Sequence, residues 1–397
     1  MVIGPGFITA SADNDAPGIA TYSMAGSRYG YSFLWLILIV TLGEVIVQEM
    51  AARLGAITGK GTADLIRERF GVKVTLFAMA CLLVANFGTT IAQFAGIAAS
   101  AELVGISRYI AVPIISLLIG FLVMRGSYIK VEKFLLILCL AALSYVVTAF
   151  LIKPDWGEIA KSVVIPHLII EPDYILTVLA TIGTTITPWG IFYMQASVVD
   201  KGVDEEDYPL TRIDIIFGTI WGNIISAFII ICTGTVLYAN GIVVEEAEQA
   251  ALALAPLAGE WSKVLFTTGM MGASILAAMV LPLSTVYAVT EAFGWERGLD
   301  TKKSDAPIFY GLYAIIIILS VVIVMIPGVP LFPIMWLSQT VNAILLPVLL
   351  VLLLKLANDH ELLGSRVNKK AQNFLTIFLT ILISLAAITF LISSLLG

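Results

Sequence analysis

The chain has 397 residues, of which 59% are hydrophobic and only 13% are charged, and its mean hydropathy is +0.99. A soluble domain carries about 25% charged residues, so this composition excludes a soluble protein and predicts an all-α polytopic membrane protein. The three cysteines lie inside apolar runs, which excludes a disulfide framework, and the net charge of −6 indicates no particular partner.

Apolar runs of about 20 residues, the length that crosses a bilayer as a helix, predict eleven spans in a single transmembrane domain over residues 1–397. In chain order they cover roughly residues 3–26, 30–54, 73–104, 109–124, 131–152, 172–200, 211–240, 260–293, 306–326, 330–357 and 371–396. The charged segment 60–70 is expected to be a short interfacial helix.

The distribution of lysine and arginine predicts the orientation. Cytoplasmic loops are enriched in these residues, and 17 of the 22 basic residues lie in loops that follow even-numbered spans. We therefore expect a cytoplasmic N-terminus and, with an odd number of spans, an external C-terminus. The short loops are typical of a prokaryotic protein of the inner or plasma membrane.

Two spans contain helix-breaking sequences near their centres. The first breaks at Asp15-Ala16-Pro17-Gly18, and the sixth breaks within residues 183–190, which read Gly-Thr-Thr-Ile-Thr-Pro-Trp-Gly. Proline removes a helical donor and leaves carbonyl groups without partners, which a membrane tolerates only inside protein or beside a polar cavity. Breaks five spans apart are typical of an inverted-repeat transporter. Residues 1–152 and 172–357 would be the repeats, and 371–396 an additional helix.

The breaks carry the candidate ion ligands. A carboxylate at this depth is costly and by default marks a cation path, so Asp15 is the first candidate, although it could instead satisfy nearby helix ends. Thr187 offers a hydroxyl beside a proline, but a membrane threonine also bonds the carbonyl one turn back. Gly18 is equally a helix breaker or a backbone ligand. Asn14 and Asp13 could hold waters of a hydrated ion, or Asp13 could face an aqueous vestibule.

The residues around these breaks resemble the NRAMP family of divalent metal transporters. The resemblance is dense over the first 70 residues and recurs at Thr187-Pro188 and Leu337-Ser338-Gln339. The matching motifs are Gly4-Pro5-Gly6-Phe7-Ile8, Asp15-Ala16-Pro17-Gly18-Ile19-Ala20-Thr21, Ala25-Gly26, Tyr29-Gly30-Tyr31-Ser32, Gln48-Glu49, Ala52-Arg53-Leu54-Gly55 and Thr58-Gly59-Lys60. The resemblance implies a LeuT-like fold of two inverted five-helix repeats plus one helix, with metal held at the unwound centres of helices 1 and 6.

The departures from the family pattern predict the ion. The family's Asp-Pro-Gly-Asn in helix 1 becomes Asp15 to Gly18 here, without the asparagine ligand, and the helix 6 methionine becomes Thr187. The family's ligating carbonyl one turn earlier falls on Thr184. Oxygen ligands suit Mg²⁺ and Mn²⁺ rather than soft metals, and Mg²⁺ keeps several waters, which a roomier site allows. The pattern is most similar to the NRAMP-related magnesium transporters.

The proton relay that the resemblance implies is missing. The family's two helix 3 acids fall in the run Thr89-Thr90-Ile91-Ala92-Gln93, which is neutral. The helix 6 histidine, a natural proton carrier, is replaced by Trp189. We therefore predict uptake that is not coupled to protons. Thr90, Gln93 and Trp189 are expected to line the path, as are Gln339 and Asn342 of helix 10 if the family fold holds.

Several alternatives stay open. The chain could carry Mn²⁺ or a trivalent cation such as aluminium, or be a non-transporting scaffold with a degenerate site. The sequence shows no nucleophile set, phosphate loop or dinucleotide motif with credible context, so no catalytic residue, cofactor or nucleic-acid partner is predicted. The expected partners are the transported ion and the bilayer, and the oligomeric state is left open, with a monomer allowed.

Overall fold

A computed structural model describes residues 14–124, 140–169, 171–296 and 305–396, and every regular element in these ranges is a helix. The longer helices are α2 (Ala16–Tyr29), α3 (Leu34–Thr58), α4 (Thr62–Leu103), α5 (Arg108–Met124), α7 (Leu143–Ile152), α9 (Pro172–Thr185), α10 (Pro188–Asp200), α11 (Tyr208–Val236), α14 (Ser262–Phe293), α15 (Pro307–Val324), α16 (Leu331–Ala357) and α18 (Lys370–Leu396). Short helices α8 (Trp156–Val164), α12 (Ala247–Leu252), α13 (Ala255–Ala258) and α17 (His360–Leu363) lie in the connections.

The described helices agree with the predicted spans. Eight helical segments are long and apolar enough to cross a membrane, and two shorter apolar helices cover 108–123 and 140–152. Together with α2 they correspond to the eleven predicted spans. The beginnings of the first and fifth spans, residues 3–13 and 131–139, lie outside the described residues. The composition therefore located the spans correctly, because hydropathy over one bilayer thickness is a local property of the sequence.

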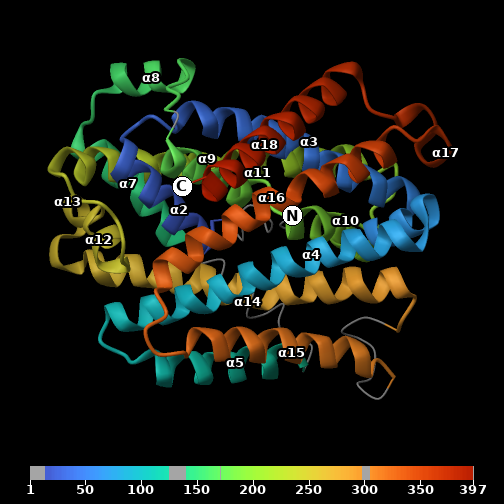
Figure 1. Cartoon of the computed structure of the whole chain (residues 1–397), viewed down its shortest axis with the longest axis horizontal. Helices are drawn as coiled ribbons and strands as arrows, with labels where there is room; N and C mark the ends of the chain where they lie inside the picture. Colours follow the sequence, from blue (N-terminus) through green and yellow to red (C-terminus); the bar gives the residue numbers. More distant parts are fainter. Residues whose placement is uncertain (1–13, 125–139, 170, 297–304, 397) are drawn as a thin grey trace.

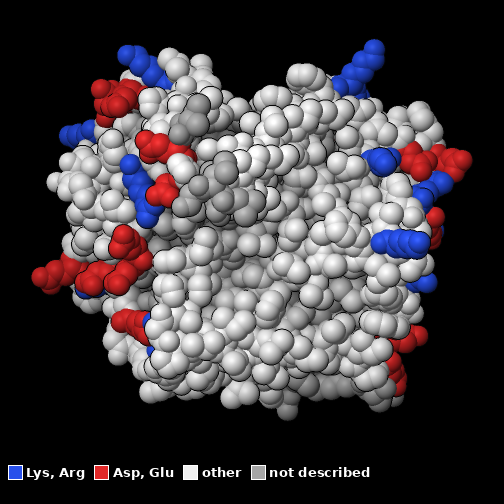
Figure 2. Space-filling view, viewed as in Figure 1, with Lys and Arg blue, Asp and Glu red and all other residues white. Residues whose placement is uncertain are grey.

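Charged side chains mark two opposite ends of the molecule. On the face shown in Figure 2, Lys, Arg, Asp and Glu gather at the two extremes of the long axis and leave a wide uncharged band between them. Many large apolar side chains are exposed in the described part of the chain, among them Leu117, Phe217 and Phe374. An apolar belt between two charged rims is the surface that a multi-pass membrane protein presents to lipid.

The interfacial helix predicted at residues 60–70 is a separate unit. It starts at Thr62 and ends at Gly71, whose φ of 76° and ψ of 175° interrupt the helical backbone before the membrane-spanning part of α4 begins. A positive φ is easily adopted by glycine and strained in other residues. Gly71 therefore lets the chain turn from the membrane surface into the bilayer.

Helix α4 lies at the centre of the packing. It runs beside α14 along the long axis of the molecule and also contacts α16, α2 and α10 (Figure 1). Glycines allow these helices to approach closely: a Cβ on Gly96 of α4 would lie 2.2 Å from Ala16 Cβ, and one on Gly183 of α9 would lie 2.0 Å from the carbonyl oxygen of Gln339. Small residues at helix contacts are the usual means of close packing in a membrane.

Close packing at Gly183 predicts the effect of a single methyl group. Gly183→Ala places a Cβ against the backbone of α16 and should lower stability by about 1–3 kcal/mol, the usual cost of overpacking. Gly311→Ala in α15 is the matched control, because nothing lies within 4 Å of its added Cβ. Thermal unfolding of the detergent-purified proteins measures both, and equal melting temperatures for the two variants would contradict the packing of α9 on α16.

Candidate functional site

Asp15 caps the helix that follows the first break. Its backbone is extended, α2 begins at the next residue, and Pro17 lies in the first turn. The carboxylate Oδ1 accepts a hydrogen bond of 2.9 Å from the N–H of Gly18. Only 3% of Asp15 is exposed. The capping bond holds one carboxylate oxygen, and Gly18 therefore helps to orient the candidate ligand.

The second carboxylate oxygen of Asp15 accepts a hydrogen bond from Gln93 Nε2 of α4. Gln93 is fully buried, and its Oε1 has no hydrogen-bond partner among the described residues. An amide that donates to a carboxylate with its nitrogen presents its oxygen nearby as an acceptor. Asp15 and Gln93 thus form a buried pair with one negative charge and an available oxygen.

Thr187 repeats the geometry of Asp15 at the second break. Ile186 and Thr187 leave the helical conformation between α9 and α10, and Pro188 opens α10. Thr187 Oγ1 accepts a hydrogen bond of 3.3 Å from the N–H of Gly190. Both breaks therefore consist of an oxygen-bearing cap, a proline in the first turn and a glycine donor three residues on. This confirms the predicted interruption of helix 6.

The end of α9 supplies a carbonyl group at the same break. In a continuous helix the carbonyl of Thr184 would accept from the N–H of residue 188, but that residue is proline. Thr184 is 1% exposed. The carbonyl is therefore a polar group that its own helix cannot satisfy, which is the property the predicted ligand requires.

Trp189 fills the position after the second break. Its side chain is fully buried, and its ring centroid lies 5.9 Å from that of Tyr193. Its carbonyl oxygen accepts a hydrogen bond of 3.2 Å from Ser284 Oγ of α14. The indole therefore contributes bulk beside the break and no group that changes charge with pH.

The helix 10 candidates form a polar cluster with α4. Asn342 Nδ2 donates to Gln339 Oε1 at 2.8 Å and to Thr89 Oγ1 at 2.9 Å. Both amides are at most 1% exposed. The hydroxyl of the neighbouring Thr90 donates to the carbonyl of Asn86 in its own helix. Gln339 and Asn342 thus bind each other, and Asn342 also binds Thr89.

Asp13 and Asn14 are the remaining candidates beside the first break. Asp13 lies outside the described residues. Asn14 points toward α11, where its Nδ2 donates to the carbonyl of Gly222 and its Oδ1 accepts from Ser226 Oγ. These α11 partners were not among the site residues predicted from the sequence. Their spacing was a usable signal, because Thr219, Asn223 and Ser226 recur every three or four residues on one helix face.

A buried polar network on Glu49 joins three helices at one end of the molecule. Its carboxylate accepts from the hydroxyl of Tyr208 and, at 2.9 Å, from Gln372 Nε2. The Arg53 guanidinium lies 3.5 Å from the same carboxylate and also bonds Asn368. The network joins α3 to α11 and α18. Glu49 therefore has a structural role, as the buried acceptor of these hydrogen bonds.

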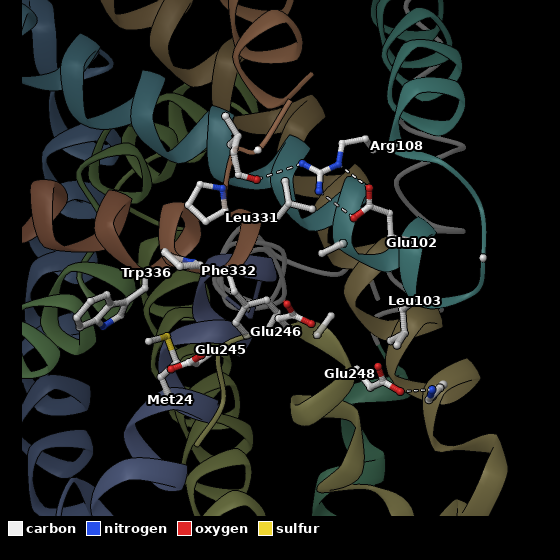
Figure 3. Close-up of a pocket in the computed structure, with 18 of the residues that line it drawn as sticks. Met24, Glu102, Leu103, Arg108, Glu245, Glu246, Glu248, Leu331, Phe332 and Trp336 are labelled. Carbon is white, nitrogen blue, oxygen red and sulfur yellow. Dashed lines mark hydrogen bonds and ion pairs between the residues drawn. The ribbon is translucent and has the colours of Figure 1, made fainter. Parts of the chain in front are cut away.

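The opposite end is hollow. A cavity of about 1000 Å³ lies between the end of α2, the end of α4, the start of α16 and the loop before α12 (Figure 3). Its wall carries Met24, about 13 Å along α2 from Asp15 at 1.5 Å per residue. The charged lining residues are Arg28, Glu102, Arg108, Glu245, Glu246, Glu248 and Lys263.

Several of these charged side chains form ion pairs with one another on the cavity wall. Arg108 Nη2 lies 3.0 Å from Glu102 Oε2, and Lys263 pairs with Glu248, as Figure 3 shows. Glu245 and Glu246 lie at the exposed end of the loop before α12. Carboxylates around a cleft raise the local concentration of cations. This vestibule therefore has the charge and size to receive a cation together with its waters.

Comparisons with known proteins agree with this geometry. A family model described as natural resistance-associated macrophage protein-like matches residues 6–393. The divalent metal cation transporter MntH of Bacillus subtilis is 25% identical over 380 residues, which covers 93% of this chain and 86% of that protein. MntH of Erwinia tasmaniensis is 27% identical over 396 residues, covering 97% and 92%.

Solved structures give the same fold. A manganese transporter of Eremococcus coleocola superposes with a TM-score of 0.76 at 21% identity, covering 97% of this chain and 84% of that one. Mhp1, a nucleobase-cation-symport-1 family transporter, gives 0.65 at 13% identity and covers 100% and 91%. MhsT gives 0.58 at 16% identity and covers 98% and 97%. The predicted all-helical, LeuT-like fold is confirmed.

The contact between Gln93 and Asp15 predicts a stability effect. Gln93→Leu removes the amide donor from a buried carboxylate and should cost about 1.5–3 kcal/mol, as for hydrogen bonds to charged groups. Thr90→Val is the control, because it removes only a bond within α4. We expect a clearly lower melting temperature for the Gln93 variant in divalent-free buffer, and equal losses in the two variants would refute the contact.

Proposed function

This chain belongs to the Nramp family of membrane proteins, and on that premise we propose that it transports a hard divalent cation across the cell membrane by alternating access. Mg²⁺ is the proposed cargo, with Mn²⁺ as a second substrate. The proposed ligands are the carboxylate of Asp15, the hydroxyl of Thr187, the carbonyl of Thr184 and the backbone at Gly18. We also propose the two repeats predicted from the sequence, residues 1–152 and 172–357, with residues 371–396 as the additional helix.

One observation carries the choice of ion: the described residues within the two breaks, 15–18 and 183–190, offer oxygen and no sulfur or imidazole. Asp15 and Thr187 are oxygen-bearing caps, and the pair of Asp15 with Gln93 adds an amide oxygen. The two histidines, His167 and His360, are exposed. Carboxylate, carbonyl and water ligands favour Mg²⁺ and Mn²⁺, whereas thioether and thiolate favour softer metals.

The vestibule supports entry of a hydrated ion. Mg²⁺ loses its waters reluctantly and is usually held by one or two carboxylates while it keeps several waters. A single buried carboxylate, Asp15, together with neutral oxygens matches that requirement. The cavity of about 1000 Å³ at the end of α2, whose wall includes Met24, leaves room for the hydration shell. Asp13 and Asn14 stay candidates for holding its outer waters.

Neutral residues at the expected relay positions support transport without proton coupling. Gln93 contacts Asp15 directly as an amide, and Trp189 fills the position after Pro188 as a buried indole. Neither side chain exchanges a proton near neutral pH. The membrane potential and the concentration gradient would then drive uptake.

The proposed orientation follows from the lysine and arginine distribution. With a cytoplasmic N-terminus, the vestibule at the end of α2 opens to the outside, and the Glu49 network closes the cytoplasmic end. The structure then corresponds to an outward-open state. We place the protein in the inner or plasma membrane of a prokaryote, with an external C-terminus and no catalytic role.

Experiments distinguish Mg²⁺ transport from two other functions, transport of a different cation and a scaffold that transports nothing. The neighbour from Eremococcus coleocola is described as a manganese transporter, and Mn²⁺ accepts the same oxygen ligands. Competition uptake against Mg²⁺, Mn²⁺ and Al³⁺ ranks these ions. A scaffold with a degenerate site would bind no divalent cation at millimolar concentration in calorimetry.

Substitutions at the two breaks test the oxygen-only site. Asp15→Ala should abolish divalent uptake into proteoliposomes, because it removes the charged ligand. Thr187→Met should raise Cd²⁺ uptake relative to Mg²⁺ by at least about tenfold, the effect of roughly 1.4 kcal/mol of added thioether binding. Thr268→Met, at an exposed position of α14, is the matched control. Unchanged selectivity in the Thr187 variant would remove the basis for naming magnesium.

Proton coupling is tested by the internal pH of the same vesicles. A pH-sensitive dye trapped inside should report no acidification that tracks Mg²⁺ entry, because the expected relay positions carry the neutral residues Gln93 and Trp189. Imposing an inside-negative potential with K⁺ and valinomycin should accelerate uptake. Acidification proportional to Mg²⁺ entry, with an uncoupler as calibration, would disprove passive transport.

A further inference from the structure

A second large cavity lies between the short helix α8 and the ends of α2 and α11. Its volume is about 590 Å³, which is within the range of cavities that bind small molecules. It shares no lining residue with the vestibule. Helix α8 lies toward the same end of the long axis as α12 and α13 (Figure 1), which is the external end in the proposed orientation.

One face of α8 forms a wall of this cavity. Glu158, Lys161 and Ser162, together with Ile165 directly after the helix, line it. Their intervals of three and four residues place them on one side of a helix. Val163, on the other side, packs against the protein core. Helix α8 is therefore amphipathic, and its polar side faces the cavity.

This wall carries one unpaired charge of each sign. Glu158 and Lys161 are exposed, and neither side chain forms a hydrogen bond or an ion pair with the part of the chain that the structure describes. On the vestibule wall, by contrast, Lys263 pairs with Glu248. A metal ion in the α8 cavity would be repelled by the lysine, and a simple anion by the glutamate. A ligand that carries both charges suits the wall better than either.

Tyrosine side chains form the opposite wall. Tyr29 is the last residue of α2, Tyr31 lies in the turn after it, and Tyr238 follows α11 and is 54% exposed. Thr235 donates to the carbonyl of Ile231, so its 2.7 Å contact with Tyr31 has the tyrosine hydroxyl as donor and leaves the tyrosine oxygen as an acceptor. Aromatic faces and hydroxyl oxygens attract an ammonium group.

Close packing holds two of these rings in place. A Cβ on Gly30, whose φ is 60°, would lie 3.2 Å from the ring of Tyr238. A Cβ on Gly234 of α11 would lie 3.2 Å from the ring of Tyr31. The turn after α2 therefore rests directly on the end of α11, and the tyrosine wall is formed without a ligand.

Apolar side chains continue from the cavity onto the surface. Val164, Ile165 and Leu168 are 74%, 62% and 69% exposed, and Ile165 also lines the cavity. Trp156, at the start of α8, is 42% exposed. An amphipathic helix with exposed apolar residues and tryptophan beside charges is typical of the boundary between lipid headgroups and acyl chains. This rim favours a ligand with acyl chains over a soluble one.

We propose that the α8 cavity binds the phosphoethanolamine headgroup of a membrane phospholipid. The ammonium group lies against the tyrosine rings and donates to the carboxylate of Glu158. The phosphate accepts from the ammonium group of Lys161 and from His167, which also lines the cavity. The acyl chains follow the apolar side chains of Ile165 and Leu168 toward the bilayer.

A lipid bound here joins α8 to the end of a broken helix. Tyr29 ends α2, the helix that begins directly after Asp15, and Tyr238 follows the end of α11. The headgroup would therefore connect three elements on one side of the molecule and stabilise their arrangement. The inference does not depend on which ion Asp15 binds.

Lipid titration of the full chain in detergent tests the proposal. Dioleoylphosphatidylethanolamine or dioleoylphosphatidylglycerol is added in mixed micelles, so that the two lipids differ only in the headgroup. We expect a saturable rise of the melting temperature with the ethanolamine lipid, as for any ligand that binds only the folded state, and one tightly bound lipid in native mass spectrometry. An equal response to both lipids, or to neither, overturns the proposal.

Variants locate the headgroup. Glu158→Gln and Lys161→Gln should each raise the half-saturating concentration of the ethanolamine lipid about fivefold, the effect of an exposed ion pair of roughly 1 kcal/mol. Glu260→Gln and Lys153→Gln are the matched controls, because they remove the same charges from exposed positions outside the cavity. An unchanged response in both cavity variants, or the same shift in the controls, overturns the assignment. All four side chains are exposed, so the substitutions should leave the fold intact.

The soluble headgroup separates a lipid from a free zwitterion. Glycerophosphoethanolamine, which has the same charges and no acyl chains, should stabilise the protein only at a much higher concentration than the lipid, because it does not contact the apolar rim. Equal affinity for the two compounds would overturn the membrane source. Divalent uptake by the wild type can succeed or fail independently of these results.

Discussion

The missing N–H of proline at each helix break is the constraint on which the rest of the site depends. Pro188 cannot bond the carbonyl of Thr184, and Pro17 occupies the first turn of α2. Backbone groups freed at membrane depth must be satisfied by protein or by a polar cavity. Asp15 and Thr187 cap the new helix starts. The breaks therefore create polar surface that only surrounding helices can enclose.

Those surrounding helices are packed closely enough to exclude lipid from the breaks. Gly96 lets α4 approach Ala16, and Gly183 lets α9 approach α16. Within this enclosure, buried charge is matched by hydrogen bonds: Asp15 by Gly18 and Gln93, Glu44 by Asn223. Carboxylates removed from water need such partners. The same packing that stabilises the fold thus keeps both buried carboxylates hydrogen-bonded inside the protein.

The two ends of the molecule differ in a way that suits alternating access. At one end Glu49, Tyr208 and Gln372 join three helices through buried hydrogen bonds. At the other end a cavity of about 1000 Å³ stands open, with its charges paired along the wall. In alternating access, the end joined by hydrogen bonds must open while the end with the cavity closes. The fold shared with the solved transporters provides the frame, and we propose that the side chains at the breaks determine the cargo.

Features that depend only on neighbouring residues in the chain could be predicted from the sequence alone. Hydropathy located the spans, proline and glycine located the breaks, and Asp15 stood out as a carboxylate in an apolar span. Only the tertiary structure decided which helix faces meet. Gln93 reaches Asp15 across 78 positions, and Glu44 meets Asn223 across 179. Such contacts depend on helix rotation and packing, which no local pattern encodes.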